Sequence, residues 1–342
     1  MVDLGYRDKA YLSKYDLDIR LFEKFNLKVT DLVPVRKVFL INTDKGDKIL
    51  KRIDCTLDEF HFIVEALKYI NRSFSFIMDF EDSIDNKKYA QWKGEYYCIM
   101  DKIEGRECEF SNPVDLSISS KGLGKLHRAS EGFRYKNSNK NICGNLLKNI
   151  TRKREEILFF KRMVSLYENR SEFDKIFLDN VDIYIEKIDK CLEFLNNTPY
   201  YKLCSEEDKI VLCHHDLAHH NIIINNDKAY FIDFDFSVID LKVHDLCNFI
   251  NKVIKNFSFD IDKAKTILDN YCSTNTLSKN ELSVLLGMMT FPEDFYDISK
   301  DYYSKRKDWE ENIFVSRLNR KIRFEPDREE FLQEFREEID KF

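Results

Sequence analysis

From Val33 to about Ile99, the pattern of hydrophobic and polar residues is mostly that of short strands. Val38–Ile41 and Lys48–Ile53 each have a strand-like pattern, and the residues between them, Asp44–Asp47, have the composition of a turn. Glu95–Met100 is a further apolar run of strand length. The pattern therefore predicts a strand hairpin followed, after an interval, by another buried strand.

A helix is predicted between the hairpin and the last of these strands. Thr56 stands where an N-cap is needed, and Glu59 follows three residues later, which is the capping-box pattern. The apolar residues that follow recur at helical spacing: Phe60, Ile63, Val64, Leu67 and Ile70. The order of hairpin, helix and strand predicts a small antiparallel sheet with one helix packed on it.

The rest of the chain is mostly helical in pattern. Helical periodicity runs through Pro113–Ser130, through roughly Asn145–Asn196, and again from about Leu246 to Phe342. One β-insert interrupts the helices, because Asn221–Ile224 and Ala229–Ile232 are two short apolar runs separated by a turn composition.

This succession predicts an α+β protein of two lobes. We expect residues 1–100 to form a β-rich N-lobe, residues 101–106 to form a hinge, and residues 107–342 to form a helical C-lobe that includes the β-insert.

Composition narrows the classes of partner and compartment. The formal net charge is -6, which gives no overall attraction to nucleic acid or to an anionic membrane, so we expect neither as a partner. No apolar run is long enough to span a bilayer, and residues 1–14 lack the apolar stretch of a signal peptide. The 9 cysteines form no C-x-x-C pair and are interpreted as reduced thiols. These features predict a cytoplasmic protein.

The sequence from His214 to Asn221 carries the most specific chemical signal. It fits H-x-D-x-x-x-x-N and is followed by the predicted hairpin, whose second strand ends at Asp233. Asp216 would orient a substrate hydroxyl and accept its proton, while the hairpin would bring Asn221 and Asp233 together as oxygen ligands of Mg²⁺. The pattern predicts phosphoryl transfer from ATP; the alternative is that Asp216 and Asn221 only cap turns.

Neighbouring histidines permit a second interpretation of this loop. His215 and His219 are four residues apart, a spacing that binds zinc when it falls on a helix. Because the segment has the pattern of strand, loop and strand, we favour magnesium chemistry. For His214 we expect a ring that hydrogen-bonds within the catalytic loop.

Lys51 is the candidate lysine for the nucleotide phosphates. It lies on the strand that precedes the predicted helix, and a glutamate of that helix should pair with it. Glu65, fourteen residues further on, is the preferred partner. Glu59 is the alternative, although it is also the predicted capping residue. A solvated strand lysine is the other interpretation of Lys51.

The chain resembles the aminoglycoside-phosphotransferase and choline-kinase superfamily of protein-kinase-like folds, and within it the CotS family of spore-coat-associated kinase-like proteins. The segments that carry the resemblance are Leu50–Ile53, Ile103–Arg106, Gly122–Ser130, His214–Asn221, Phe231–Phe234, His244–Leu246 and Phe291–Asp297. The sequence departs from the superfamily at Val35–Lys37, which has no glycine, and at His215, where glycine is frequent.

The resemblance implies ATP and Mg²⁺ as cofactors and assigns roles to individual residues. Asp216 matches the catalytic aspartate, and Asn221 and Asp233 match the metal ligands. Lys51 matches the nucleotide lysine. The resemblance also implies that the backbone of Asp101 and Ile103 holds adenine and that Asp245 braces the catalytic loop from a following helix.

Two functions follow from this resemblance. The first is phosphorylation of a hydroxyl on an unidentified small molecule. Glu293 and Asp294 could attract a cationic acceptor, although a solvated helix face is the favoured interpretation of these charges. The second is a structural or assembly role in the spore coat, with other coat proteins as partners and little turnover. Antibiotic resistance is a third, weaker interpretation.

Overall fold

A five-stranded antiparallel sheet forms the first part of the protein. The computed structural model describes residues 15–136, 139–255 and 259–341, so the first 14 residues of the predicted N-lobe lie outside the described ranges. The strands pair in the order β1-β2-β3-β5-β4. Their bounds are Val29–Val35 (β1), Val38–Thr43 (β2), Gly46–Arg52 (β3), Ala90–Trp92 (β4) and Glu95–Asp101 (β5).

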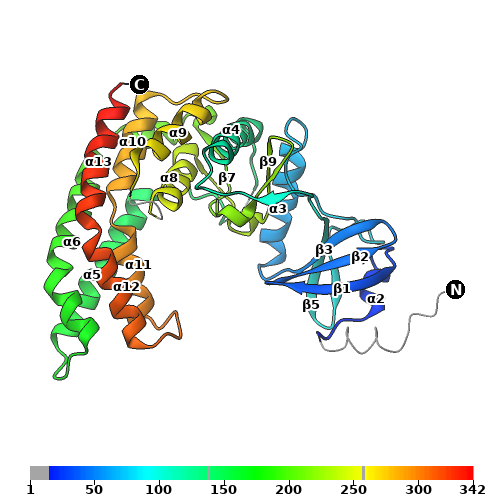
Figure 1. The fold of residues 1–342 in the computed structure, drawn as a ribbon, viewed down its shortest axis with the longest axis horizontal. Helices are drawn as coiled ribbons and strands as arrows, with labels where there is room; N and C mark the ends of the chain where they lie inside the picture. The colour runs from blue at the N-terminus through cyan, green and yellow to red at the C-terminus, as the bar shows by residue number, and fades with distance from the viewer. Residues whose placement is uncertain (1–14, 137–138, 256–258, 342) are drawn as a thin grey trace.

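The predicted hairpin and last strand are confirmed as β2, β3 and β5, while β1 begins before the predicted region and the short β4 was not predicted. The predicted helix is α3 (Leu57–Ile70), and the capping box of Thr56 and Glu59 is present. The α+β, two-lobed fold class is likewise confirmed (Figure 1).

The sheet has two apolar faces that pack against different partners. One face, which includes Leu50 and Ile99, packs with the short helix α2 (Ile19–Glu23) in a small core of its own. The buried face of α3 belongs instead to a larger core that continues through the helices of the second lobe. Figure 1 shows α3 between the sheet and the helical lobe.

Helices make up most of the second lobe. In the described residues they are α4 (Pro113–Ser130), α5 (Leu146–Ser165), α6 (Glu172–Asn196), α7 (Tyr200–Leu203), α8 (Lys242–Ile254), α9 (Ile261–Cys272), α10 (Lys279–Thr290), α11 (Glu293–Tyr303), α12 (Glu311–Arg323) and α13 (Glu325–Ile339). The helical stretch predicted from Asn145 to Asn196 is two helices, because Ser171 caps a new one through its hydroxyl and the carboxylate of Asp174. None of the described helices has both the length and the apolar composition needed to cross a membrane.

Two small sheets hold the loops that carry the candidate site. β7 (Ile210–Cys213) pairs with β10 (Val238–Leu241). The predicted hairpin is β8 (Ile222–Asn225) and β9 (Lys228–Phe231), and β6 (Arg106–Glu107) adds to its edge. Both the β10 pairing and the β6 strand were missed by the pattern analysis.

The hairpin is hydrogen-bonded on one side to the strand after the hinge and on the other to a segment within the N-terminal lobe. β6, which directly follows the hinge, pairs with β8. On the other side of the hairpin, the Met78 amide donates to the Phe231 carbonyl at 3.1 Å, and the Phe231 amide donates to the Phe76 carbonyl at 3.0 Å. Side chains of the hairpin are therefore positioned by contacts from both lobes.

Candidate active site

The loop from His214 to Asn221 is held in shape by one buried carboxylate. Asp245, in the first turn of α8, accepts a hydrogen bond from the backbone amide of His214 at 2.6 Å and from that of His215 at 2.8 Å. His127 of α4 contacts the same carboxylate at 3.1 Å. Burial alone would raise the pKa of Asp245. The hydrogen bond and the electrostatic attraction from His127 instead hold this pKa well below its usual value. Asp245 thus braces the loop, as the resemblance implied.

The His214 ring connects this loop to the metal hairpin. Its Nε2 lies 2.9 Å from the carbonyl oxygen of Ile232, and its Nδ1 accepts the backbone amide of Asp216 at 3.3 Å. Burial lowers the pKa of His214, so the ring is neutral at pH 7, with Nε2 protonated. His214 therefore positions Asp216, and its nitrogens are both occupied by backbone groups.

Asp216 presents an ionised carboxylate. The Asn221 side-chain amide donates to its carbonyl at 2.8 Å and to its Oδ2 at 3.1 Å, and Lys252 of α8 binds Oδ1. Burial would raise the pKa of Asp216, but Lys252 lowers it below the usual value. Sequence reasoning missed Lys252; its signal is the seven-residue spacing from Asp245, which puts both on one face of α8.

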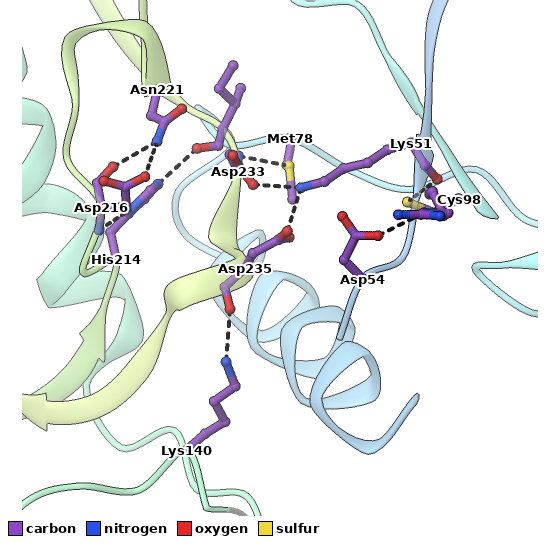
Figure 2. Close-up of polar contacts among 12 residues, drawn as sticks. Lys51, Asp54, Met78, Cys98, Lys140, His214, Asp216, Asn221, Asp233 and Asp235 are labelled. Atoms are coloured by element: carbon purple, nitrogen blue, oxygen red, sulfur yellow. Dashed lines mark hydrogen bonds and ion pairs between the residues drawn. The ribbon is translucent and has the colours of Figure 1, made fainter. Parts of the chain in front are cut away.

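Asp233 and Asp235 lie across the cleft from β3 and share the ammonium group of Lys51. Nζ of Lys51 is 2.6 Å from Asp233 Oδ1 and 2.7 Å from Asp235 Oδ2 (Figure 2). Burial would lower the pKa of Lys51, but these two carboxylates raise it well above its usual value. Asp233 adopts a left-handed backbone conformation, with φ of 64°, which aspartate tolerates better than most residues. Sequence analysis missed Asp235, although it stands two residues after Asp233.

The predicted pairing of Lys51 with Glu65 or Glu59 is wrong. The Glu59 carboxylate accepts hydrogen bonds from the amide and hydroxyl of Thr56, so it serves the capping box. Glu65 lies on the exposed side of α3. The lysine is instead neutralised from the other lobe, where the turn after β9 brings two carboxylates within reach.

The hinge residues have different environments. Asp101 is the last residue of β5, and its carboxylate accepts a bond from Lys48 at 2.6 Å, which directs it back toward the sheet. Ile103 is partly buried against the main core. The adenine-binding role of their backbone groups stays a prediction.

The turn between β1 and β2 contains no glycine, and Arg36 takes the left-handed backbone conformation there. Arg36 has a φ of 55°, and its guanidinium lies 3.0 Å from Glu107 of β6. Because both side chains are exposed, this ion pair contributes little to stability, about 0–1 kcal/mol. It nevertheless joins the β1–β2 turn to the strand after the hinge.

The four histidines do not gather in the way that the zinc interpretation requires. His219 is exposed and lies 3.4 Å from Glu107, whereas the His215 ring faces that of His244 with centroids 4.5 Å apart. Within the described ranges, the group of side chains close enough together to bind a metal ion is His215, Asp240 and His244. Their potential ligand atoms all lie within 4.8 Å of one another. His219, the partner that the alternative zinc interpretation gave to His215, is not part of this group.

The oxygen atoms at the cleft suit a magnesium nucleotide. Asn221 donates through its nitrogen to Asp216, which leaves its amide oxygen as a ligand, and Asp233 and Asp235 each offer a carboxylate. Oxygen donors of this kind are what Mg²⁺ prefers, and Lys51 supplies a cation for phosphate. The residues present therefore fit ATP with Mg²⁺.

A β-sheet lobe, a mostly helical lobe and this loop-and-hairpin site together define a protein-kinase-like fold. The structure is similar to an aminoglycoside phosphotransferase from Alicyclobacillus acidocaldarius, with a TM-score of 0.81, 16% identity, and coverage of 99% of this chain and 100% of that one. It is also similar to amicoumacin kinase hAmiN, solved with AMP-PNP and Ca²⁺, with a TM-score of 0.61, 15% identity, and coverage of 95% and 96%. At these identities the likeness shows the fold.

Residues 19–335 match the family model described as "Spore coat putative kinase YutH", and the chain belongs to that family. The chain is also similar to Spore coat protein S of Bacillus subtilis (strain 168), with 22% identity over 307 residues, which are 88% of this chain and 87% of that protein. The resemblance to spore-coat kinase-like proteins is thereby confirmed.

Proposed function

We propose that this protein transfers the γ-phosphoryl group of ATP to a hydroxyl group of a small molecule, with Mg²⁺ as cofactor, in association with the spore coat. The observation that carries the proposal is the ionised carboxylate of Asp216, held by Asn221 and by the braced loop beside the Lys51 cleft. The family and the kinase-like neighbours support it.

In the proposed reaction, Asp216 orients the acceptor hydroxyl and takes its proton as the oxygen attacks the γ-phosphorus. The bond between that phosphorus and the β–γ bridging oxygen breaks, and ADP leaves. Lys51 binds phosphate oxygens, and Asn221 and Asp233 would hold the metal. Bound Mg²⁺ would neutralise phosphate charge. His214 and Asp245 keep the loop in place through the process.

Different roles for Asp216 and Asp233 provide the test. We expect Asp233→Asn to remove most magnesium-dependent ATP binding, because a metal ligand is lost. Asp216→Asn should leave ATP binding nearly intact and lower turnover by about 10²–10⁴-fold, the usual effect of losing a positioned base. Calorimetric titration of ATP and Mg²⁺ into both variants measures the first effect without knowledge of the acceptor.

The exposed Asp262→Asn on α9 is the matched control, since it makes the same chemical change away from the site. Equal ATP affinity in the parent and in Asp233→Asn would mean that the cleft is not a magnesium-nucleotide site. Loss of binding in Asp216→Asn alone would reverse the assigned roles.

A structural role in the spore coat is the second candidate. The observation that favours it is the pairing of the site carboxylates with lysines: Lys51 binds Asp233 and Asp235, and Lys252 binds Asp216. A protein that never binds nucleotide would keep these ion pairs. Failure of the parent protein to bind ATP with Mg²⁺ in the same titration would support this candidate.

A further inference from the structure

A large cavity lies among the helices on the side of the catalytic loop away from the sheet lobe. Its volume is about 790 Å³, and its lining comes from α5, α6, α8 and α10 through α13. The lining is mixed: apolar and aromatic side chains such as Ile150, Met288 and Phe295 alternate with polar and charged ones. A volume of this size suits a small organic molecule.

Charged residues around this cavity are mostly cationic. The lining has seven lysines and arginines against four carboxylates. Three of the carboxylates are bound by cations of the same lining, and the pairs are Glu293 with Lys153 at 2.5 Å, Asp294 with Lys321 at 2.7 Å, and Glu325 with Arg328 at 3.0 Å. Glu293 and Asp294, which the sequence offered as a possible attraction for a cationic acceptor, are thus already neutralised.

The fourth carboxylate, Asp297, keeps most of its negative charge at neutral pH. Burial and the neighbouring carboxylates raise its pKa to about 6, which is still below pH 7. His215 adds no positive charge, because burial lowers its pKa to about 4. Against the single charge of Asp297 stand four cations that no carboxylate of the lining binds: Arg152, Lys252, Lys255 and Arg320.

These four cations differ in how they are engaged. Lys255 and Arg320 are exposed and form no ion pair with any residue in the described ranges. Arg152 lies 3.8 Å from Glu156, a carboxylate that Lys300 already binds at 2.9 Å. Lys252 lines the cavity and at the same time binds the Asp216 carboxylate. It is therefore the direct link between the cavity and the proposed catalytic base.

We propose that this cavity is the acceptor site and that it takes a small anionic hydroxyl compound, such as a phosphorylated or carboxylated polyol. Arg320 and Lys255 at the rim and Lys252 inside bind the anionic group. An anion that draws Lys252 toward itself frees the Asp216 carboxylate for the acceptor hydroxyl. The assignment of this cavity to the acceptor rests on the proposed function. The binding of an anion in the cavity does not depend on turnover.

The first experiment measures binding alone. Inorganic phosphate and glycerol 3-phosphate, with glycerol and choline for comparison, are titrated calorimetrically into the full-length protein without nucleotide. We expect the two anions to bind, and glycerol and choline to bind at least tenfold more weakly. Binding of the anions should weaken as NaCl is raised, because the rim charges are exposed to solvent.

Two surface variants locate the site. Arg320→Gln with Lys255→Gln should weaken phosphate binding at least tenfold, which corresponds to about 1.4 kcal/mol. Arg317→Gln is the matched control, since it removes the same charge from the same helix, at a side chain that stacks on Trp309 outside the cavity lining. Absence of phosphate binding in the parent, equal affinity in the double variant, or preferential binding of choline would each overturn the inference.

A second readout separates this inference from the proposed function. ADP release from ATP and Mg²⁺ is followed with glycerol 3-phosphate and with glycerol as acceptors. Faster release with the anionic acceptor supports both statements. If anions bind as expected but the parent fails to bind ATP with Mg²⁺, the proposed function fails while the anion site stands.

Discussion

Replacing Asp245 with asparagine tests whether one buried carboxylate shapes the catalytic loop. The carboxylate is fully buried and accepts the backbone amides of His214 and His215 through its two oxygens. Asparagine has nearly the same volume but only one acceptor oxygen. Whichever way its amide turns, an N–H group of the side chain faces a backbone N–H or the His127 ring.

The expected loss of stability follows from these contacts. A buried backbone donor left without an acceptor costs about 1–3 kcal/mol, and hydrogen bonds to a charged group are worth about 1.5–3 kcal/mol each. Burying a neutral amide in place of a carboxylate is less costly and offsets part of this. We therefore expect Asp245→Asn to lower the free energy of unfolding by about 2–4 kcal/mol.

Guanidinium unfolding followed by tryptophan fluorescence provides the measurement. The 2 tryptophans report on both lobes, because Trp92 is in β4 of the sheet and Trp309 packs among the helices beside Phe314. Asp262→Asn, which changes an exposed aspartate in α9, should change stability by less than about 0.5 kcal/mol.

Calorimetry on the folded variant completes the test. Since Asp245 does not touch Lys51 or Asp233, ATP and Mg²⁺ should still bind, while turnover falls because Asp216 loses its support. A loss of stability below about 0.5 kcal/mol, with turnover unchanged, would refute the reasoning.

Two further predictions concern the backbone and the response to acid. Burial lowers the pKa of His215 from 6.5 to about 4, so between these values the unfolded chain binds a proton that the folded protein does not. The free energy of unfolding is therefore highest above pH 6.5 and decreases as pH falls toward 4. His215→Gly should remove up to about 3 kcal/mol of this pH dependence, measured by unfolding at pH 7 and pH 4.5. A Cβ at Gly105, where φ is 140°, would lie 2.5 Å from the Ile224 carbonyl oxygen, so Gly105→Ala should destabilise the protein by about 1–3 kcal/mol more than Gly94→Ala, whose Cβ meets nothing within 4 Å. Equal thermal shifts for the two alanine variants would contradict the second expectation.

Elements that depend on neighbouring residues were predictable from the sequence. The β2–β3 hairpin, the capping box of α3 and the hairpin after the catalytic loop each follow from a few adjacent positions. The catalytic loop itself was recognisable because its spacing fits one chemistry, and its brace by Asp245 was implied by the resemblance.

Contacts between distant segments were not predictable in the same way. Lys51 and Asp235 are separated by 184 residues, and their pairing depends on how the two lobes meet rather than on any local pattern. The position of Lys51 on the strand before α3 predicted a glutamate of α3 as its partner. In the structure, Glu65 is exposed to solvent and Glu59 caps the N-terminus of α3. Similarly, the β7–β10 pair joins two strands that the whole catalytic loop and hairpin separate in the sequence.

The large core has a consequence for any attempt to divide this protein into parts. Apolar side chains of α3, such as Phe62 and Ile63, belong to the same buried cluster as Leu123 of α4 and Phe231 of β9. Cutting the chain at the hinge would thus divide one hydrophobic core and expose apolar surface on both fragments. Truncation libraries and fusion designs should accordingly keep residues 57–339 in one polypeptide, because a fragment that starts at residue 107 would expose the surface that α3 now covers.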